Sequence, residues 1–133
     1  MNFLIIGLGS MGKRRIRNLQ ALNVGSILGV DLVTDRRREV ENTYGVKTLD
    51  SLESVLMDSI DAVIVSTPPD KHDIGIQFAL KNNKPVFVEA SVVLGRLTYL
   101  NVVAKKKHIL VCPSCTMRFH PAVKIIKRIV TGH

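Results

Sequence analysis

The chain opens with a short apolar run that enters a glycine-rich turn. Phe3–Ile6 is followed by Gly7, Gly9 and Gly12, which have the G-x-G-x-x-G spacing. In a dinucleotide site the first glycine permits a tight turn, the second lets backbone approach a pyrophosphate, and the third lets the next helix pack closely on the sheet. The free N–H groups at the start of that helix then point at the phosphates. Three glycines alone are a weak signal, but their place directly after a strand predicts a dinucleotide-binding turn.

Short apolar runs alternate with segments of helical periodicity along the rest of the chain. This alternation predicts βαβ units around a parallel sheet, in an α/β, doubly wound, Rossmann-type fold with three αβα layers. The expected strands are residues 3–6, 27–33, 46–49, 62–66, 85–89 and 109–112. The expected helices are residues 11–22, 36–44, 71–81 and 97–107, one that starts at 50–53, and a last one from Pro121 that stops at Gly132.

Length and composition indicate the class of protein. The chain has 133 residues, of which 46% are hydrophobic and 23% charged. These values are typical of a soluble globular protein, and the length suits one dinucleotide-binding domain, residues 1–133. No apolar run is long enough to span a bilayer, and no basic segment precedes the first strand as in a secretion signal. With two cysteines, the sequence favours a reducing, cytoplasmic setting.

The net charge of +8 is high for this length. A basic surplus favours anionic partners, among them nucleotides, sugar phosphates, nucleic acid and acidic protein surfaces. The alternative is that the lysines and arginines cover solvated helix faces, and this is the commoner case. Side chains that stack on bases are scarce, since the chain has no Trp and two Tyr, so nucleic acid is a disfavoured partner.

Asp31 lies 19 residues beyond Gly12, near the end of the second expected strand. A Rossmann domain keeps an acid there that accepts hydrogen bonds from the adenosine ribose hydroxyls. A carboxylate at this point favours NAD over NADP, because it repels a 2′-phosphate. Arg36 and Arg37 keep NADP open, since an arginine just past this strand can hold that phosphate. The alternative for Asp31 is an ordinary acid at a strand end.

Three further candidates follow the fourth and fifth expected strands. In an open parallel sheet the ligand crevice lies beyond the carboxyl ends of the strands, so Thr67 and Pro68 are expected to line the cofactor, unless they only end the strand. His72 needs a substrate within hydrogen-bond reach to act in catalysis, and the commoner role is a hydrogen bond to a neighbouring loop. Glu89 is expected to face the crevice or to pair with one of the lysines.

Cys112 and Cys115 have the C-x-x-C spacing. A thioredoxin-like pair would stand at a helix N-terminus after an early strand, whereas this pair follows the last expected strand. Two cysteines alone do not complete a structural zinc site, so no metal site is predicted. The favoured interpretation is a buried pair of small residues.

These motifs, in this order, resemble the N-terminal domain of the Gfo/Idh/MocA oxidoreductases. The similarity covers essentially the whole chain and is most specific in two stretches. The matching segments are Gly7-Leu-Gly-Ser-Met-Gly12, Asp31, Asp61-Ala-Val-Ile-Val-Ser-Thr-Pro-Pro-Asp-Lys-His72, Lys84-Pro-Val-Phe-Val-Glu89 and Arg118-Phe-His-Pro121. The more specific ones are the stretch from Thr67 to His72 and the Arg118–Pro121 stretch.

The resemblance implies a set of cofactor contacts and a reaction. Family members use NAD(P) to oxidise or reduce a carbon of a sugar, polyol or related compound. The glycine turn with Ser10 and Met11 would hold the pyrophosphate and Asp31 the ribose, with Arg36 beside it. Glu89 matches a glutamate near the nicotinamide. The residues expected to bind the cofactor are Gly7, Gly9, Ser10, Met11, Gly12, Asp31, Arg36, Thr67, Pro68, His72 and Glu89. His72 and Glu89 are also the candidates for supporting roles in catalysis.

The sequence departs from the family in two respects. Ala90 follows Glu89 where the family has the lysine that exchanges a proton with the reacting hydroxyl. Such an acid–base group contributes typically ~10²–10⁴-fold, so its loss is expected to cripple hydride transfer without preventing cofactor binding. Family chains are also much longer and add a C-terminal domain with the substrate pocket, which these residues do not include.

Three functions therefore remain open from the sequence. The first is the NAD(P)-binding domain of an oxidoreductase whose parent family acts on sugars or polyols, not catalytic as this chain alone. The second is a non-catalytic dinucleotide-binding, sensor or interaction module. The third is a basic protein that binds anions or nucleic acid. Because apolar residues near Cys112 to Phe119 would lack a partner domain, a homo-oligomer is expected.

Overall fold

A computed structural model describes residues 1–90, 95–115 and 119–132. Its sheet has six parallel strands in the order β3-β2-β1-β4-β5-β6. The strands are β1 (Asn2–Ile6), β2 (Ser26–Val30), β3 (Lys47–Leu49), β4 (Ala62–Val65), β5 (Val86–Val88) and β6 (Val111–Pro113). The strand order reverses between β1 and β4, which is the doubly wound arrangement expected from the sequence. The Rossmann-type fold is confirmed.

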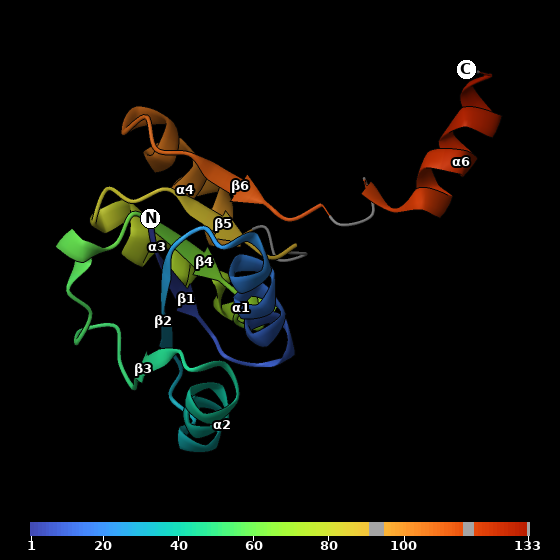
Figure 1. The fold of residues 1–133 in the computed structure, drawn as a ribbon. Helices are drawn as coiled ribbons and strands as arrows, with labels where there is room; N and C mark the ends of the chain where they lie inside the picture. The colour runs from blue at the N-terminus through green and yellow to red at the C-terminus, as the bar shows by residue number, and fades with distance from the viewer. Residues whose placement is uncertain (91–94, 116–118, 133) are drawn as a thin grey trace.

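Helices cover both faces of this sheet (Figure 1). One face packs against α1 and α2, and the other against α3 and α4. The helices are α1 (Ser10–Leu22), α2 (Thr34–Tyr44), α3 (His72–Lys81), α4 (Gly95–Lys106) and α6 (Pro121–Thr131), with 3₁₀ turns η1 (Met57–Ser59) and η2 (Pro69–Lys71). None of the described helices is long and apolar enough to cross a membrane.

The first strand shows why its sequence is a continuous apolar run. Leu4 and Ile6 belong to the cluster that includes residues of α3 and α4, whereas Ile5 belongs to the cluster with Ile16 of α1 and Val40 of α2. Successive side chains of a strand point to opposite faces. A central strand that is covered on both faces therefore needs apolar residues at every position.

The glycine turn brings α1 against the end of β1. A Cβ on Gly12 would lie 1.9 Å from the carbonyl oxygen of Gly7, and a Cβ on Gly7 would lie 2.9 Å from the backbone of Ser66. Gly7 also has a φ of +91°, a conformation that side chains with a Cβ rarely adopt. The two glycines are thus required by close packing, which holds the start of α1 over the carboxyl edge of the sheet.

The segment after β3 differs from the expectation. Residues 50–53 do not start an α-helix; the chain turns there and forms only the 3₁₀ turn η1 before β4. Val55 and Ile60 are buried, and Leu52 packs against the same core. These three contacts hold the segment against the core in a non-helical path. Tertiary packing therefore overrides the helix-capping signal at Asp50 and Ser51.

The expected burial of Cys112 and Cys115 is wrong, because both are exposed free thiols. Cys112 of β6 pairs in register with Phe87 of β5, so both side chains point to the α1 face of the sheet. Among the described residues, α1 and α2 pack over β1 and its neighbours rather than over β6. The cysteine therefore lies on an uncovered part of that face.

The last helix stands apart from the rest of the domain. Figure 1 shows α6 extending away from the sheet and its covering helices. None of its residues is buried, and its end at Gly132 in a left-handed conformation is as expected. Arg118 of the predicted Arg118–Pro121 motif lies outside the described residues.

Replacement of Gly12 by alanine tests the close approach of α1 to β1. The added methyl would overlap backbone that has no room to shift, so the free energy of unfolding is expected to fall by at least about 2 kcal/mol. Urea denaturation followed by circular dichroism measures this. Gly9→Ala is the matched control, because a Cβ there meets nothing within 4 Å. An unchanged midpoint for Gly12→Ala would contradict the packing described.

Candidate dinucleotide-binding site

The carboxyl ends of the strands lie along one edge of the sheet. After five of the six strands, the next residue still donates a backbone hydrogen bond to the neighbouring strand. The N–H of Gly7 donates to Val30 O at 2.8 Å, and that of Ser66 to Ile6 O at 2.8 Å. The same extension fixes three other residues, Asp31, Glu89 and Ser114, through bonds to Leu49, Val65 and Val88 at 3.2, 3.1 and 2.7 Å. Five residues on different strands are thereby held at the same edge, where an open α/β sheet binds its ligand.

The start of α1 opens onto this edge without a protein cap. Gly9 is the N-cap, no side chain caps the helix, and the first turn carries no acid. Ser10 is exposed, Met11 is half-buried, and a Cβ on Gly9 would meet only open space. The uncapped N–H groups and the positive end of the helix dipole suit a negatively charged group. These residues therefore form a cradle that a phosphate can approach.

Asp31 is buried beside the glycine turn, with 8% of its surface exposed. Its Oδ2 accepts the Leu8 N–H at 2.7 Å, and its Oδ1 accepts the Val33 N–H at 2.8 Å. Arg36 lies at the margin, with its Nη1 3.5 Å from Oδ2. Arg37 donates instead to the Asp31 carbonyl oxygen at 2.8 Å. The two backbone bonds fix the carboxylate, and its remaining lone pairs stay available to ribose hydroxyls.

Three buried polar atoms after β4 have no hydrogen-bond partner within the described structure. They are Ser66 Oγ, Thr67 Oγ1 and His72 Nδ1. Buried polar atoms are rarely left unpaired, so these three need a partner other than the described residues. Pro68 is exposed at the same loop.

His72 itself is almost completely buried, with 1% of its surface exposed. Its Nε2 lies 2.9 Å from the carbonyl oxygen of Thr67. This geometry corresponds to the alternative that the histidine bonds a neighbouring loop. The bond also leaves Nδ1 as the atom without a partner.

Glu89 pairs with an arginine rather than with a lysine. Arg15 of α1 places Nε 2.6 Å from Oε1 and Nη2 2.9 Å from Oε2, a two-bonded fork. Ala90, the residue after Glu89, is exposed. Sequence reasoning did not single out Arg15, although one signal was present. Arg15 lies three residues after Gly12 and next to buried Ile16, so a basic residue occupies the inward stripe of α1.

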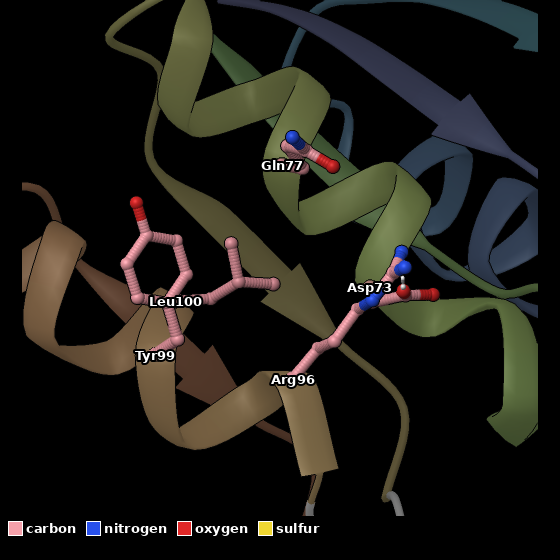
Figure 2. A pocket seen from close by; sticks show the side chains of 5 residues that line it. All are labelled: Asp73, Gln77, Arg96, Tyr99 and Leu100. Atoms are coloured by element: carbon pink, nitrogen blue, oxygen red, sulfur yellow. Dashed lines mark hydrogen bonds and ion pairs between the residues drawn. The ribbon is translucent and has the colours of Figure 1, made fainter.

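A separate hollow lies between α3 and α4, away from these residues. Figure 2 shows its lining side chains, with Arg96 Nη1 3.3 Å from Asp73 Oδ2. The hollow has a volume of about 350 Å³ and is lined by Asp73, Gln77, Arg96, Tyr99 and Leu100. It shares no residue with the strand-end edge, and its ion pair is largely solvent-exposed. It is therefore not the candidate site.

Replacement of Asp31 by alanine is expected to loosen the glycine turn. The buried Leu8 N–H would lose its acceptor, so the free energy of unfolding should fall by about 1–3 kcal/mol. Chemical denaturation of the variant measures this. Asp35→Ala, four residues on and exposed in the first turn of α2, is the control and should stay within about 0.5 kcal/mol of the parent chain. Equal losses in the two variants would rule out a specific role of the Asp31 carboxylate.

The fold agrees with that of known dehydrogenases. An inositol 2-dehydrogenase from Renibacterium salmoninarum is 29% identical over 92 residues, which are 67% of this chain and 28% of the relative. A probable dehydrogenase from Thermotoga maritima superposes with a TM-score of 0.85 at 26% identity, over 99% of this chain and 41% of that one. An oxidoreductase from Agrobacterium radiobacter in complex with NAD⁺, L-tartaric acid and magnesium gives a TM-score of 0.87 at 14% identity, over 99% and 40% of the two chains.

The present chain thus spans about two fifths or less of the length of these relatives. The sequence pattern of the oxidoreductase family with an NAD-binding Rossmann fold matches residues 1–111. The match favours the dinucleotide-binding function over an anion- or nucleic-acid-binding protein. Since it covers most of the chain, the protein belongs to the Gfo/Idh/MocA oxidoreductases and is an NAD-binding domain of that family.

Proposed function

We propose that NAD(H) lies across the strand-end edge with its pyrophosphate on the start of α1. The amides of the Gly7–Gly12 turn, including Ser10 and Met11, then meet the phosphates, and Asp31 accepts the adenosine ribose hydroxyls. The other half of the dinucleotide extends over the ends of β4 and β5. There Thr67, Pro68 and Glu89 line it, and His72 lies buried behind them with its bond to Thr67. The observation that carries this proposal is the uncapped start of α1, where a Cβ on Gly9 would meet only open space.

The parent activity that fits is hydride transfer to or from the alcohol carbon of a sugar or polyol. Bound nicotinamide supplies the hydride chemistry, and the protein supplies binding and orientation. An inositol 2-dehydrogenase among the relatives supports a polyol-like substrate. His72 and Glu89 are the supporting groups near the reacting end. Ala90 offers no proton to a hydroxyl, so the 133-residue chain by itself holds the cofactor and does not turn over substrate.

The preferred cofactor form is NAD(H). The buried Asp31 carboxylate would repel a 2′-phosphate, whereas the half-exposed guanidinium of Arg36, 3.5 Å from it, would attract one. The carboxylate is fixed by two backbone bonds, whereas the Arg36 side chain is half exposed, where solvent weakens its attraction for a phosphate. NADP(H) is therefore bound, but more weakly.

Exposed side chains also support a proposal for the cellular compartment and for the oligomeric state. Two exposed free thiols fit a reducing cytoplasm.

The apolar stripe of α6 is exposed, with Ile129 at 76% and Val130 at 77%, and Ile125 and Ile126 lie on the same side. A stripe of this kind favours association, so the 133-residue chain forms homo-oligomers through α6.

Titration with NADH and NADPH, by fluorescence or calorimetry, tests the binding proposal. The parent chain should bind NADH more tightly than NADPH. Gly9→Ala should fold normally but weaken NADH binding by at least about tenfold, because its methyl fills the space where a phosphate approaches. Its denaturation midpoint serves as the control for folding. Absence of binding by the parent chain to either nucleotide would overturn the proposal.

Light scattering after gel filtration tests the assembly. The double change Ile126→Ser and Ile129→Ser should shift the protein to monomer, because it removes the centre of the apolar stripe. The matched double change Lys124→Ser and Lys127→Ser alters the basic side of the same helix and should leave the oligomer in place. A parent chain that is monomeric at every concentration would refute association through α6.

A further inference from the structure

Arg15 connects the first helix to the two last strands of the sheet. From α1 it forms a fork to Glu89, with contacts of 2.6 and 2.9 Å, across 74 positions in sequence. The guanidinium also lies over the Phe87 ring, 4.9 Å from its centroid, and its Nη2 is 3.5 Å from Ser114 Oγ. A two-bonded arginine–carboxylate pair with a ring beneath it is geometrically specific as well as strong.

The burial of this pair separates it from the other ion pairs of the described structure. The side chains of Arg15 and Glu89 are only 18% and 13% exposed. In the pairs of Lys13 with Glu39 and of Arg96 with Asp73, at least one partner is half exposed or more. Exposed pairs contribute little to stability, whereas a half-buried pair leaves a costly charge behind when one partner is removed. Each of the two charges therefore depends on the other for compensation.

The strand order places this unit at one end of the dinucleotide. Asp31 follows β2 and the glycine turn follows β1, while Glu89 follows β5 on the other side of β4. If Asp31 holds the adenosine ribose and α1 the pyrophosphate, the nicotinamide extends over β4 toward β5. The Glu89 carboxylate therefore lies toward the nicotinamide end, and Ser66 and Thr67 lie between.

This inference rests on the proposed function and deepens it. We propose that Arg15 is a positioning residue, which holds the Glu89 carboxylate and offsets its charge at the nicotinamide end of the site. The ring of NAD⁺ carries a positive charge that NADH lacks, so a bare carboxylate nearby favours the oxidised form. With Arg15 in place, this preference for the oxidised form is reduced. The adenosine ribose at Asp31 lies on the far side of β1 and β4 from Glu89 and carries no charge that differs between the two forms.

The test measures the ratio of the dissociation constants for NAD⁺ and NADH in two variants. One variant removes the positive charge of the pair and the other removes the negative charge. Arg15→Gln exposes the carboxylate and should favour NAD⁺ about three- to tenfold relative to the parent chain. Glu89→Gln leaves the guanidinium uncompensated and should shift the same ratio toward NADH by a similar factor. Arg15→Lys keeps the charge and should retain the parent ratio. Calorimetric titrations supply all the constants.

Binding of ADP-ribose, which lacks the nicotinamide, distinguishes this role from a structural one. Its affinity measures what each variant does to the pyrophosphate cradle on the same helix, and this change should be smaller than the change in the ratio for Arg15→Gln and Glu89→Gln. In Arg14→Gln, a matched control on the exposed side of α1, the ratio should not change. Shifts in the same direction for Arg15→Gln and Glu89→Gln, or equal losses for ADP-ribose and NADH, would overturn the positioning role. If Arg15→Gln does not fold, Glu89→Gln and Arg15→Lys decide the question. Failure of the parent chain to bind ADP-ribose would instead overturn the proposed function, and this inference with it.

Discussion

The close contact of α1 with the end of β1 is the constraint on which the rest of the site depends. A Cβ on Gly12 would overlap the Gly7 carbonyl oxygen, so the helix sits as near to the sheet as backbone allows. This approach places the uncapped N–H groups of α1 at the carboxyl edge. It also brings Arg15, one turn further along, within reach of Glu89 on a strand two positions away.

The charged groups along that edge are arranged symmetrically about the start of α1. An acid stands toward each end, and each has an arginine beside it: Asp31 with Arg36 and Glu89 with Arg15. The middle is formed by the start of α1, whose dipole is positive, and no acid lies in its first turn. In the proposed complex, the two phosphates face the positive end of α1, and an acid with an arginine beside it lies on each side.

Much of this was predictable from short stretches of sequence. The alternation of apolar runs and helical periodicity predicted all six strands, and the glycine spacing predicted where α1 begins. Two predictions were wrong, and in both cases packing between segments distant in sequence decided the outcome. Residues 50–53 carry a helix-start signal, but Val55 and Ile60 pack into the core in another path. Cys112 follows an apolar run, yet at β6 none of the described helices packs over its side of the sheet.

The sequence by itself determined which residues stand at the carboxyl ends of the strands, because strand ends and glycine turns are set by neighbours in the chain. Only the tertiary structure decided which of them meet. The bond from Leu8 to Asp31 and the fork from Arg15 to Glu89 both join separate elements. Such contacts depend on the order of the strands and on how closely a helix approaches them, and no local pattern specifies either.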